Sequence, residues 1–202
     1  MSNATNAWGD QAMKSFIDLN PDQVMDAVET LGLRCTGRML QLNSMENRVY
    51  EIEIENGLPE LMWPDPESPP AHPKLLVAKF YRPGRWSKEQ IQDEHTFLHQ
   101  LKDNDLNVIA PLIHQSQTVW RTPSDELFFC IYEKRAGRTP YDLPKEEWEK
   151  LGRLLARMHL IGETTPAKNR LTLNPATYGD SNIQTILQSS YLTDKYRDVW
   201  HQ

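Results

Sequence analysis

A lysine inside an apolar strand segment constrains the fold of this chain more than any other feature of the sequence. Residues 75–81 read LLVAKFY and are followed by Pro83-Gly84, which is typical of a buried strand that ends in a turn. An ammonium group in such a strand loses hydration unless it finds a partner. Lys79 therefore predicts an acidic side chain on an element that packs against this strand.

The next segment supplies a candidate for that acidic side chain. Ser87 and Gln90 form the pattern of a capping box, which predicts a helix from Ser87 to about residue 103. At about 100° per residue, Glu94 falls in the middle of the apolar stripe of this helix. The stripe consists of Ile91, Phe97, Leu98 and Leu101. We therefore expect an ion pair between Lys79 and Glu94.

Kinase folds use such a pair to hold the α and β phosphates of ATP. Two alternatives remain open at this point. The pair could be a purely architectural salt bridge, or the lysine could bury its stem and extend its charged end into water.

Other local signals place the remaining elements. Asn20-Pro21 is typical of a helix start, and residues 39–42 and 48–54 are predicted strands joined by a polar turn. Further predicted strands are residues 111–114, 117–121 and 127–133. A helix is predicted from a cap at Asp142, with Pro144 in its first turn, to Gly162, and a weak helix from about Ser181. Six prolines between residues 57 and 74 predict an exposed loop.

Composition and charge exclude several classes of protein. The longest uninterrupted apolar run is residues 127–132, far short of the roughly 20 residues that a membrane span needs. The net charge of −6 and the lack of clustered Lys and Arg argue against nucleic acid as a partner. Cys35 and Cys130 show no metal or redox spacing, so we expect small buried thiols in a reducing cytoplasm.

A nucleotide site also needs a loop over the phosphates, and residues 43–47 (NSMEN) are the candidate. Neither G-x-G-x-x-G nor a Walker A sequence is present. The backbone N–H groups of this loop and the Ser44 hydroxyl could still contact phosphate oxygens. An ordinary polar hairpin turn is the alternative.

Four segments together resemble a known family. Residues 42–50, 77–86, 93–95 and 152–159 look like bacterial stress-response kinases, which belong to the protein-kinase-like superfamily with aminoglycoside phosphotransferases, choline kinases and type II homoserine kinases. The resemblance implies an ATP-dependent Ser/Thr protein kinase of the bacterial cytoplasm. With the order of the elements, it implies an α+β, protein-kinase-like fold: a five-stranded antiparallel N-lobe with one packed helix, followed by the start of a helical C-lobe.

Composition, the order of the elements and the resemblance together divide the chain into parts. Residues 1–19 would be a flexible leader, 20–134 the ATP-binding N-lobe, 135–139 the hinge or linker, and 140–202 the first part of a truncated helical C-lobe. The implied partners are ATP and a protein substrate with Ser or Thr, without nucleic acid or membrane.

Site residues are implied in the same way. Ser44 would contact ATP, Lys79 its phosphates, and Glu94 would orient Lys79, while the backbone of residues 132–134 would meet adenine. The full implied nucleotide site is Ser44, Asn47, Lys79, Glu94, Tyr132, Glu133 and Lys134.

The sequence departs from the family in its catalytic residues. The family's His-Gly-Asp followed by Asn, and its later Asp-x-Asp, do not occur in these 202 residues. Residues 178–182 (YGDSN) lack the His and have too short an Asp-to-Asn spacing, so we do not assign them as the catalytic loop. We expect an N-terminal portion of a kinase whose Mg²⁺ ligands lie in a missing C-terminal part, and which binds ATP weakly and transfers no phosphate.

Two other functions remain alternatives: a small-molecule phosphotransferase acting on homoserine, choline or an aminoglycoside, and a non-catalytic nucleotide-binding regulatory module. Apolar surface meant for missing helices predicts self-association. Among the weaker signals, His95 and His99 are interpreted as surface or boundary residues, and Trp148 as part of a core. Arg82 and Arg85 beside Trp86 could attract a phosphopeptide, but solvated loop arginines are the commoner case.

Overall fold

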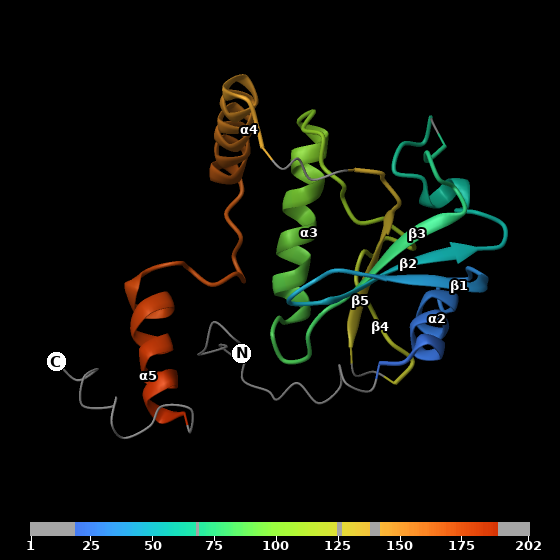
Figure 1. Ribbon diagram of the computed structural model, residues 1–202, viewed down its shortest axis with the longest axis horizontal. Coiled ribbons are helices and arrows are strands. Elements are labelled where there is room, and N and C mark those ends of the chain that lie inside the picture. Colours follow the sequence, from blue (N-terminus) through green and yellow to red (C-terminus); the bar gives the residue numbers. More distant parts are fainter. Residues whose placement is uncertain (1–18, 68, 125–126, 138–141, 190–202) are drawn as a thin grey trace.

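A five-stranded antiparallel sheet forms the centre of the structure (Figure 1). The computed structural model describes residues 19–67, 69–124, 127–137 and 142–189. The strands are β1 (Cys35–Leu42), β2 (Arg48–Ile54), β3 (Leu75–Phe80), β4 (Trp120–Arg121) and β5 (Phe128–Glu133), in the order β1-β2-β3-β5-β4. The predicted α+β class and the antiparallel sheet are confirmed.

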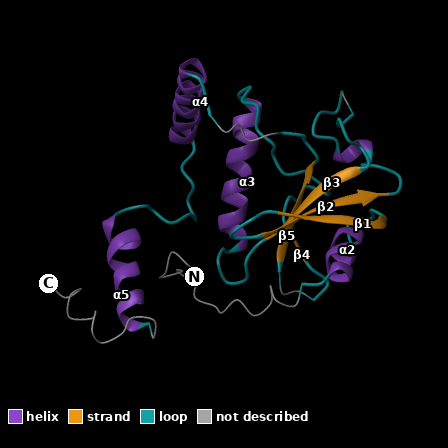
Figure 2. Cartoon of the chain, in the orientation of Figure 1, coloured by secondary structure: helices purple, strands orange, loops and turns teal. Residues whose placement is uncertain are grey.

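The helices are α2 (Pro21–Glu29), α3 (Lys88–Asp103), α4 (Lys145–Thr164) and α5 (Ser181–Gln188). Figure 2 shows them around the sheet, with α4 and α5 on the side of α3 that faces away from the strands. A 3-10 turn, η1 (Glu60–Met62), interrupts the proline-rich loop, and a π-helical turn, η2 (Pro175–Asp180), leads into α5.

Strand alternation gives the sheet two different faces. On β3, Leu76, Ala78 and Phe80 are fully buried and belong to the larger core. Lys79 points to the opposite face because side chains alternate along a strand. Its register neighbours are Val49 on β2 and Cys130 on β5.

Helix α2 covers the face of the larger core. It begins as predicted, with Pro21 in its first turn and the Asn20 side chain accepting a hydrogen bond from the Gln23 N–H. Its buried residues Val24, Ala27 and Val28 pack into the same core as the inward side chains of β2 and β3. The sheet therefore carries a helix on this face in addition to the predicted one.

Helix α3 covers the face of Lys79. The predicted capping box is confirmed, since the Ser87 hydroxyl accepts from the Gln90 N–H and the Gln90 side chain accepts from the Ser87 N–H. Ile91 is fully buried and joins Val119 and Cys130 in a second, smaller core. Both cysteines are free thiols, Cys130 buried and Cys35 half-buried.

Of the two strands predicted near β4, one is wrong and the other is longer than the strand that forms. Residues 111–114 form no strand, because Pro111 has no N–H to donate and only the Leu112 N–H reaches β5, at the Ile131 carbonyl. Residues 117–121 contribute only Trp120–Arg121 to the sheet, since His114 and Gln117 pair with each other in a tight turn.

Helix α4 differs from its prediction in cap and packing. Pro144 occupies the N-cap position, and Asp142 instead accepts a hydrogen bond from the Leu143 N–H. The helix has no buried residue, and Trp148 is 57% exposed, so its assignment to a core is wrong. Its contact with α3 is at the far end, where a Cβ on Gly162 would lie 3.6 Å from the Phe97 ring.

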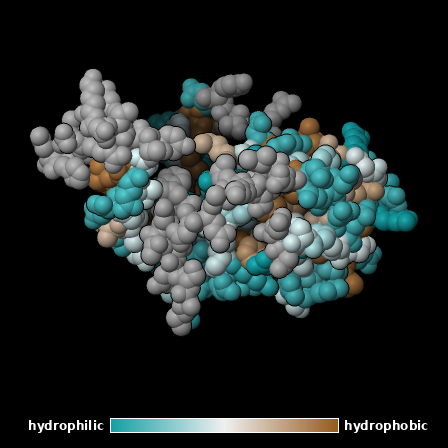
Figure 3. All heavy atoms as spheres, turned by 90° about the horizontal axis from the view of Figure 1, so that it is seen from below, coloured by the Kyte–Doolittle hydropathy of each residue, from teal (hydrophilic) through white to brown (hydrophobic). Residues whose placement is uncertain are grey.

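Helix α5 was predicted from about Ser181 and does begin there. Its Ile183 and Ile186 are partly exposed, and Figure 3 shows hydrophobic surface at the left end of the molecule, where α5 lies. None of the helices in the described parts of the chain is long and apolar enough to cross a membrane.

The division into leader, N-lobe, hinge and C-lobe stays a prediction. Residues 1–18 of the leader lie outside the described residues, as do positions 138–139 of the hinge and residues 140–141 and 190–202 of the C-lobe.

Candidate functional site

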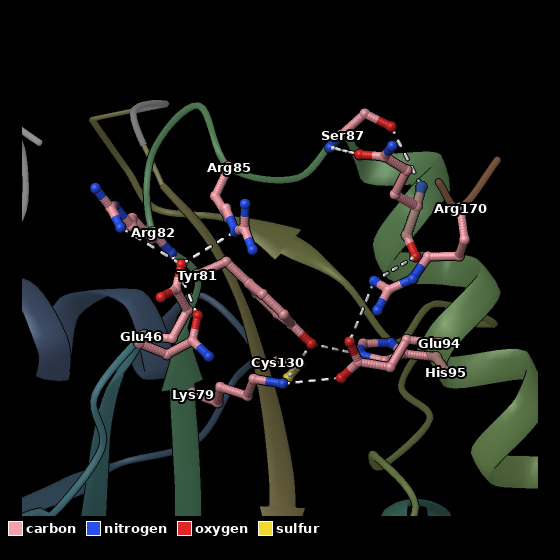
Figure 4. A network of polar contacts seen from close by, with 12 residues as sticks. Glu46, Lys79, Tyr81, Arg82, Arg85, Ser87, Glu94, His95, Cys130 and Arg170 are labelled. Carbon is pink, nitrogen blue, oxygen red and sulfur yellow. Dashed lines mark hydrogen bonds and ion pairs between the residues drawn. The ribbon is translucent and has the colours of Figure 1, made fainter. Parts of the chain in front are cut away.

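The predicted ion pair between strand and helix is confirmed. Lys79 Nζ on β3 lies 2.8 Å from Glu94 Oε1 on α3 (Figure 4). The two side chains are 20% and 26% exposed, so the pair is partly shielded from water but open on one side. A charge-assisted contact of this length fixes the position of the ammonium group.

A buried polar network lies beside the pair and ties α3 to the sheet. The Tyr81 hydroxyl and His95 Nε2 are hydrogen-bonded at 2.8 Å, and His95 Nδ1 is bonded to the Thr118 hydroxyl at 2.8 Å. Tyr81 Oη also lies 3.5 Å from the Cys130 sulfur. The Lys79 ammonium lies 4.4 Å from the centre of the Tyr81 ring, a cation–π contact.

His95 is therefore not the surface or boundary residue that we expected. It is only 2% exposed, and this burial lowers the pKa of the imidazole to about 4. Neighbouring charges act in both directions, since Glu94 raises the pKa of His95 while Lys79 and His99 lower it. At neutral pH the ring is uncharged and serves as a bridge between two hydroxyl groups.

The loop of residues 43–47 joins β1 to β2 and is fastened at its end. The Ser44 hydroxyl accepts a hydrogen bond from the Asn47 N–H at 3.3 Å, and the Asn47 side-chain oxygen accepts from the Arg82 N–H at 3.4 Å. Asn47 lies two residues before Val49, the register neighbour of Lys79. The structure thus places this loop at the end of the strands next to the lysine.

A cluster of charges also holds this loop. The Glu46 carboxylate oxygen Oε1 lies 3.1 Å from Arg85 Nε and 3.5 Å from Arg82 Nη1. The Arg85 guanidinium lies 4.7 Å from the centre of the Trp86 ring, and its side chain is only 13% exposed. The interpretation of Arg82 and Arg85 as solvated loop arginines is therefore wrong, because both are bound to a loop that precedes β2.

The residues predicted to meet adenine, 132–134, lie at the end of β5. Tyr132 pairs with Val77 and Glu133 with Leu76, so both are held by β3. Tyr132 shares the Lys79 face of the sheet with Cys130, and burial raises the pKa of its hydroxyl.

Glu133 is 6% exposed, and its Oε2 lies 3.0 Å from Arg135 Nε in an ion pair. Lys134 pairs with Glu51 on β2. The side chains of Glu133 and Arg135 thus bind each other, and the Lys134 side chain binds Glu51.

A further residue, Arg170, was missed by sequence reasoning. It follows α4, yet its Nη1 lies 3.6 Å from Glu94 Oε2. Lys79, Arg82, Arg85 and Arg170 thus lie against the carboxylates of Glu46 and Glu94.

The donor set fits the phosphates of a nucleotide and not a metal ion. A lysine held by a carboxylate, a loop with a hydroxyl and backbone N–H groups, and nearby guanidinium groups are the donors that phosphates bind. Among the described residues, no three His, Cys, Asp or Glu side chains are arranged to hold a metal ion. The residues 178–182 lie in η2 and the start of α5.

Comparison with known proteins agrees with this geometry. Residues 43–201 match the phosphotransferase enzyme family, that is, most of the chain. The chain belongs to this phosphotransferase family. It is 32% identical over 164 residues to stress response kinase A of Escherichia coli strain K12, and 31% identical over 164 residues to the serine/threonine protein kinase RdoA of Salmonella typhimurium. The match covers 81% of this chain and 44% of each relative, so the chain spans less than half of their length.

Solved structures of phosphotransferases share the fold. An amicoumacin kinase, hAmiN, solved with AMP-PNP, Ca²⁺ and Ami, superimposes with a TM-score of 0.60 at 17% identity, over 95% of this chain and 53% of its own. A microcompartment-associated aminopropanol kinase gives a TM-score of 0.53 at 16% identity, over 88% and 56% of the two chains. At these identities the similarity shows the fold alone.

Proposed function

We propose that this chain is the nucleotide-binding part of an ATP-dependent Ser/Thr protein kinase of the stress-response type. The observation that carries the proposal is the ion pair of Lys79 and Glu94, which joins the central strand of the sheet to the helix packed on it at 2.8 Å. The membership of the phosphotransferase family and the names of the relatives support it.

Each site residue would have a definite role in binding ATP. Lys79 would contact the phosphates, and Glu94 would hold the ammonium in place. The Ser44 hydroxyl and the N–H groups of residues 44–46 would cover the phosphates, while the Asn47 N–H binds the Ser44 oxygen. The backbone of residues 132–134 would meet adenine. Since the described residues do not fit a metal ion, we assign no magnesium ligand to them.

The test is a titration of the 202-residue chain with ATP, followed in ¹H–¹⁵N NMR spectra, which detect weak binding. Shifts should appear at residues 44–47, Lys79 and 132–134. Lys79→Met should weaken binding about 10- to 100-fold, because a hydrogen bond to a charged group contributes about 1.5–3 kcal/mol.

Lys74→Met is the matched control, because Lys74 is exposed and directly precedes β3. It should leave the affinity unchanged. Equal affinities of the wild type and Lys79→Met, or shifts confined to another surface, would contradict the proposal.

A small-molecule phosphotransferase is the second candidate. It is favoured by the two solved structures with this fold, whose names describe kinases of amicoumacin and of aminopropanol. Both candidates share the ATP site. They are separated by assaying the protein isolated from its own cells with radiolabelled ATP, offering a generic protein substrate in one arm and homoserine, choline and an aminoglycoside in the other.

A non-catalytic regulatory module remains the third candidate. Mass spectrometry of the natural protein distinguishes it, because a native product that ends at Gln202 supports the module and a longer product supports the two kinases.

A further inference from the structure

Two consecutive residues after α4 contact one face of α3. Asn169 and Arg170 reach Gln90, Asp93 and Glu94, which are spaced i, i+3 and i+4 and therefore lie side by side on the helix. We define Asn169 and Arg170 as the latch. It joins two segments that are 76 residues apart in the sequence.

The contact of Asn169 is bidentate. Its backbone N–H donates to Asp93 Oδ2 at 2.6 Å, and its side-chain amide donates to Asp93 Oδ1 at 3.1 Å. Both oxygens of the carboxylate are thus bound by one residue. Such a contact fixes the backbone at Asn169 and therefore the position from which the next side chain extends.

Arg170 is that next side chain, and it binds at three points. Its Nη1 lies 3.6 Å from Glu94 Oε2 and 3.5 Å from the backbone oxygen of Gln90. Its guanidinium lies 4.2 Å from the centre of the Trp86 ring, just before α3 begins. In Figure 4, Arg170 reaches the Glu94 carboxylate from above and Lys79 reaches it from the left.

The two oxygens of Glu94 are therefore divided between two cations. Oε1 binds Lys79 from the sheet, and Oε2 binds Arg170 from the segment after α4. Without a second partner, a glutamate that is 26% exposed would populate several rotamers, and each rotamer would hold Lys79 in a different position. The second cation restricts this choice.

We propose that Arg170 is a positioning residue of the phosphate site, which acts by fixing Glu94 and through it Lys79. This inference rests on the proposed function, because it assigns the site a residue from outside the sheet and its helix. It also makes phosphate binding depend on how the segment after α4 docks on α3.

The test compares two arginines that both join the later part of the chain to α3. Arg170→Met removes the contact with Glu94. Arg157→Met is the matched control, since Arg157 Nη2 donates to the Asn104 carbonyl at 3.0 Å, at the far end of the helix and away from Glu94. Arg170→Met should weaken binding of ATP to the 202-residue chain about 5- to 10-fold and leave binding of adenosine, which has no phosphates, unchanged. Arg157→Met should alter neither affinity.

A double-mutant cycle then asks whether Arg170 acts through Glu94. In a Glu94→Gln background, Arg170→Met should cause no further loss of ATP affinity. An equal loss in both backgrounds would overturn the inference, because Arg170 would then act on the nucleotide directly. An equal loss of adenosine binding would also overturn it, since that result indicates a general structural defect.

Failure of the latch is distinguishable from failure of the proposed function. If Lys79→Met weakens ATP binding and Arg170→Met does not, the role proposed for Arg170 is wrong, while the proposed nucleotide site is supported. If the wild type binds no ATP, the proposed function is wrong, and amide hydrogen exchange still tests the latch. Arg170→Met should then speed exchange in the first half of α3 at least fivefold and Arg157→Met should not, whereas equal exchange in both variants would overturn it.

Discussion

Acidification from pH 7 to pH 4 is expected to destabilise the chain through the buried His95. This ring is 2% exposed, and burial lowers its pKa from 6.5 to about 4. In the unfolded chain the same ring would take up a proton near its ordinary pKa of about 6.5. Between these two values the unfolded state binds more protons than the folded state, so the free energy of unfolding falls as the pH falls.

The magnitude follows from the size of the pKa difference. A shift of one pKa unit corresponds to about 1.4 kcal/mol, so the full window contributes at most about 3 kcal/mol. This contribution is complete above about pH 6.5 and is lost progressively down to about pH 4. For a domain with a stability of about 5–15 kcal/mol, the loss is large enough to measure.

The assay is urea denaturation at pH 7, 6, 5 and 4, followed by tryptophan fluorescence. Carboxyl groups also titrate in this range, so the informative quantity is the difference between the wild type and His95→Gln, which cannot take up a proton at that position. That difference should shrink by about 3 kcal/mol between pH 7 and pH 4. His72→Gln is the control, because His72 is exposed, and its curve should run parallel to that of the wild type.

Parallel pH curves for the wild type and His95→Gln would refute the reasoning. Such a result would mean that the ring is protonated in the folded state near its ordinary pKa, with the Tyr81 and Thr118 hydroxyl groups both accepting from it. The network beside Lys79 would then carry an additional positive charge at mildly acidic pH.

Three further predictions concern the loop, α4 and catalysis. Glu46→Gln should speed amide exchange in residues 44–47 several-fold, because two ion pairs that fasten the loop are lost, and unchanged exchange would show that the backbone bonds suffice. Trp148→Glu together with Leu155→Glu should reduce self-association in sedimentation experiments, because both side chains are exposed on α4; an unchanged sedimentation profile would exclude this face. The 202-residue chain should transfer no phosphate from radiolabelled ATP to a generic protein substrate, and turnover that Lys79→Ala abolishes would contradict this.

Local signals in the sequence predicted the elements that build the site. The bounds of β2 are those predicted, and the capping box of Ser87 and Gln90 sets the start of α3 as expected. The pairing of Lys79 with Glu94 could be predicted because it depends on two short periods, one of a strand and one of a helix. Each is readable within about 15 residues of sequence.

The same reasoning does not find His95. At about 100° per residue it lies about 40° beyond Ile91, on the side away from Leu98 and Leu101 and so outside the apolar stripe of α3. We interpreted His95 as a surface residue because histidine is often exposed. The hydrogen-bond partners that allow it to be buried lie on other segments of the chain. Those partners are Tyr81 and Thr118.

The remaining contacts could not be predicted from local patterns. Arg170 meets Glu94 only because α4 reverses the direction of the chain beside α3, and no spacing in the sequence reports that path. Glu46 likewise meets Arg82 and Arg85 across two strands. The exposure of Trp148 was missed for a different reason. An apolar stripe predicts that one face of a helix is buried, but it does not show which element packs against that face.

One question that the sequence leaves open, whether Lys79 and Glu94 form an architectural salt bridge or a phosphate site, can be decided by replacing both residues. Lys79→Met alone leaves Glu94 paired with Arg170, and replacing both members of a buried ion pair by apolar residues is often neutral for stability. We therefore expect Lys79→Met, and Lys79→Met with Glu94→Leu, to unfold within about 1 kcal/mol of the wild type. The double variant should nevertheless lose ATP binding as fully as the single one. If it loses stability and keeps its affinity for ATP, the pair is architectural, and the positive charge that attracts the nucleotide lies with the arginines.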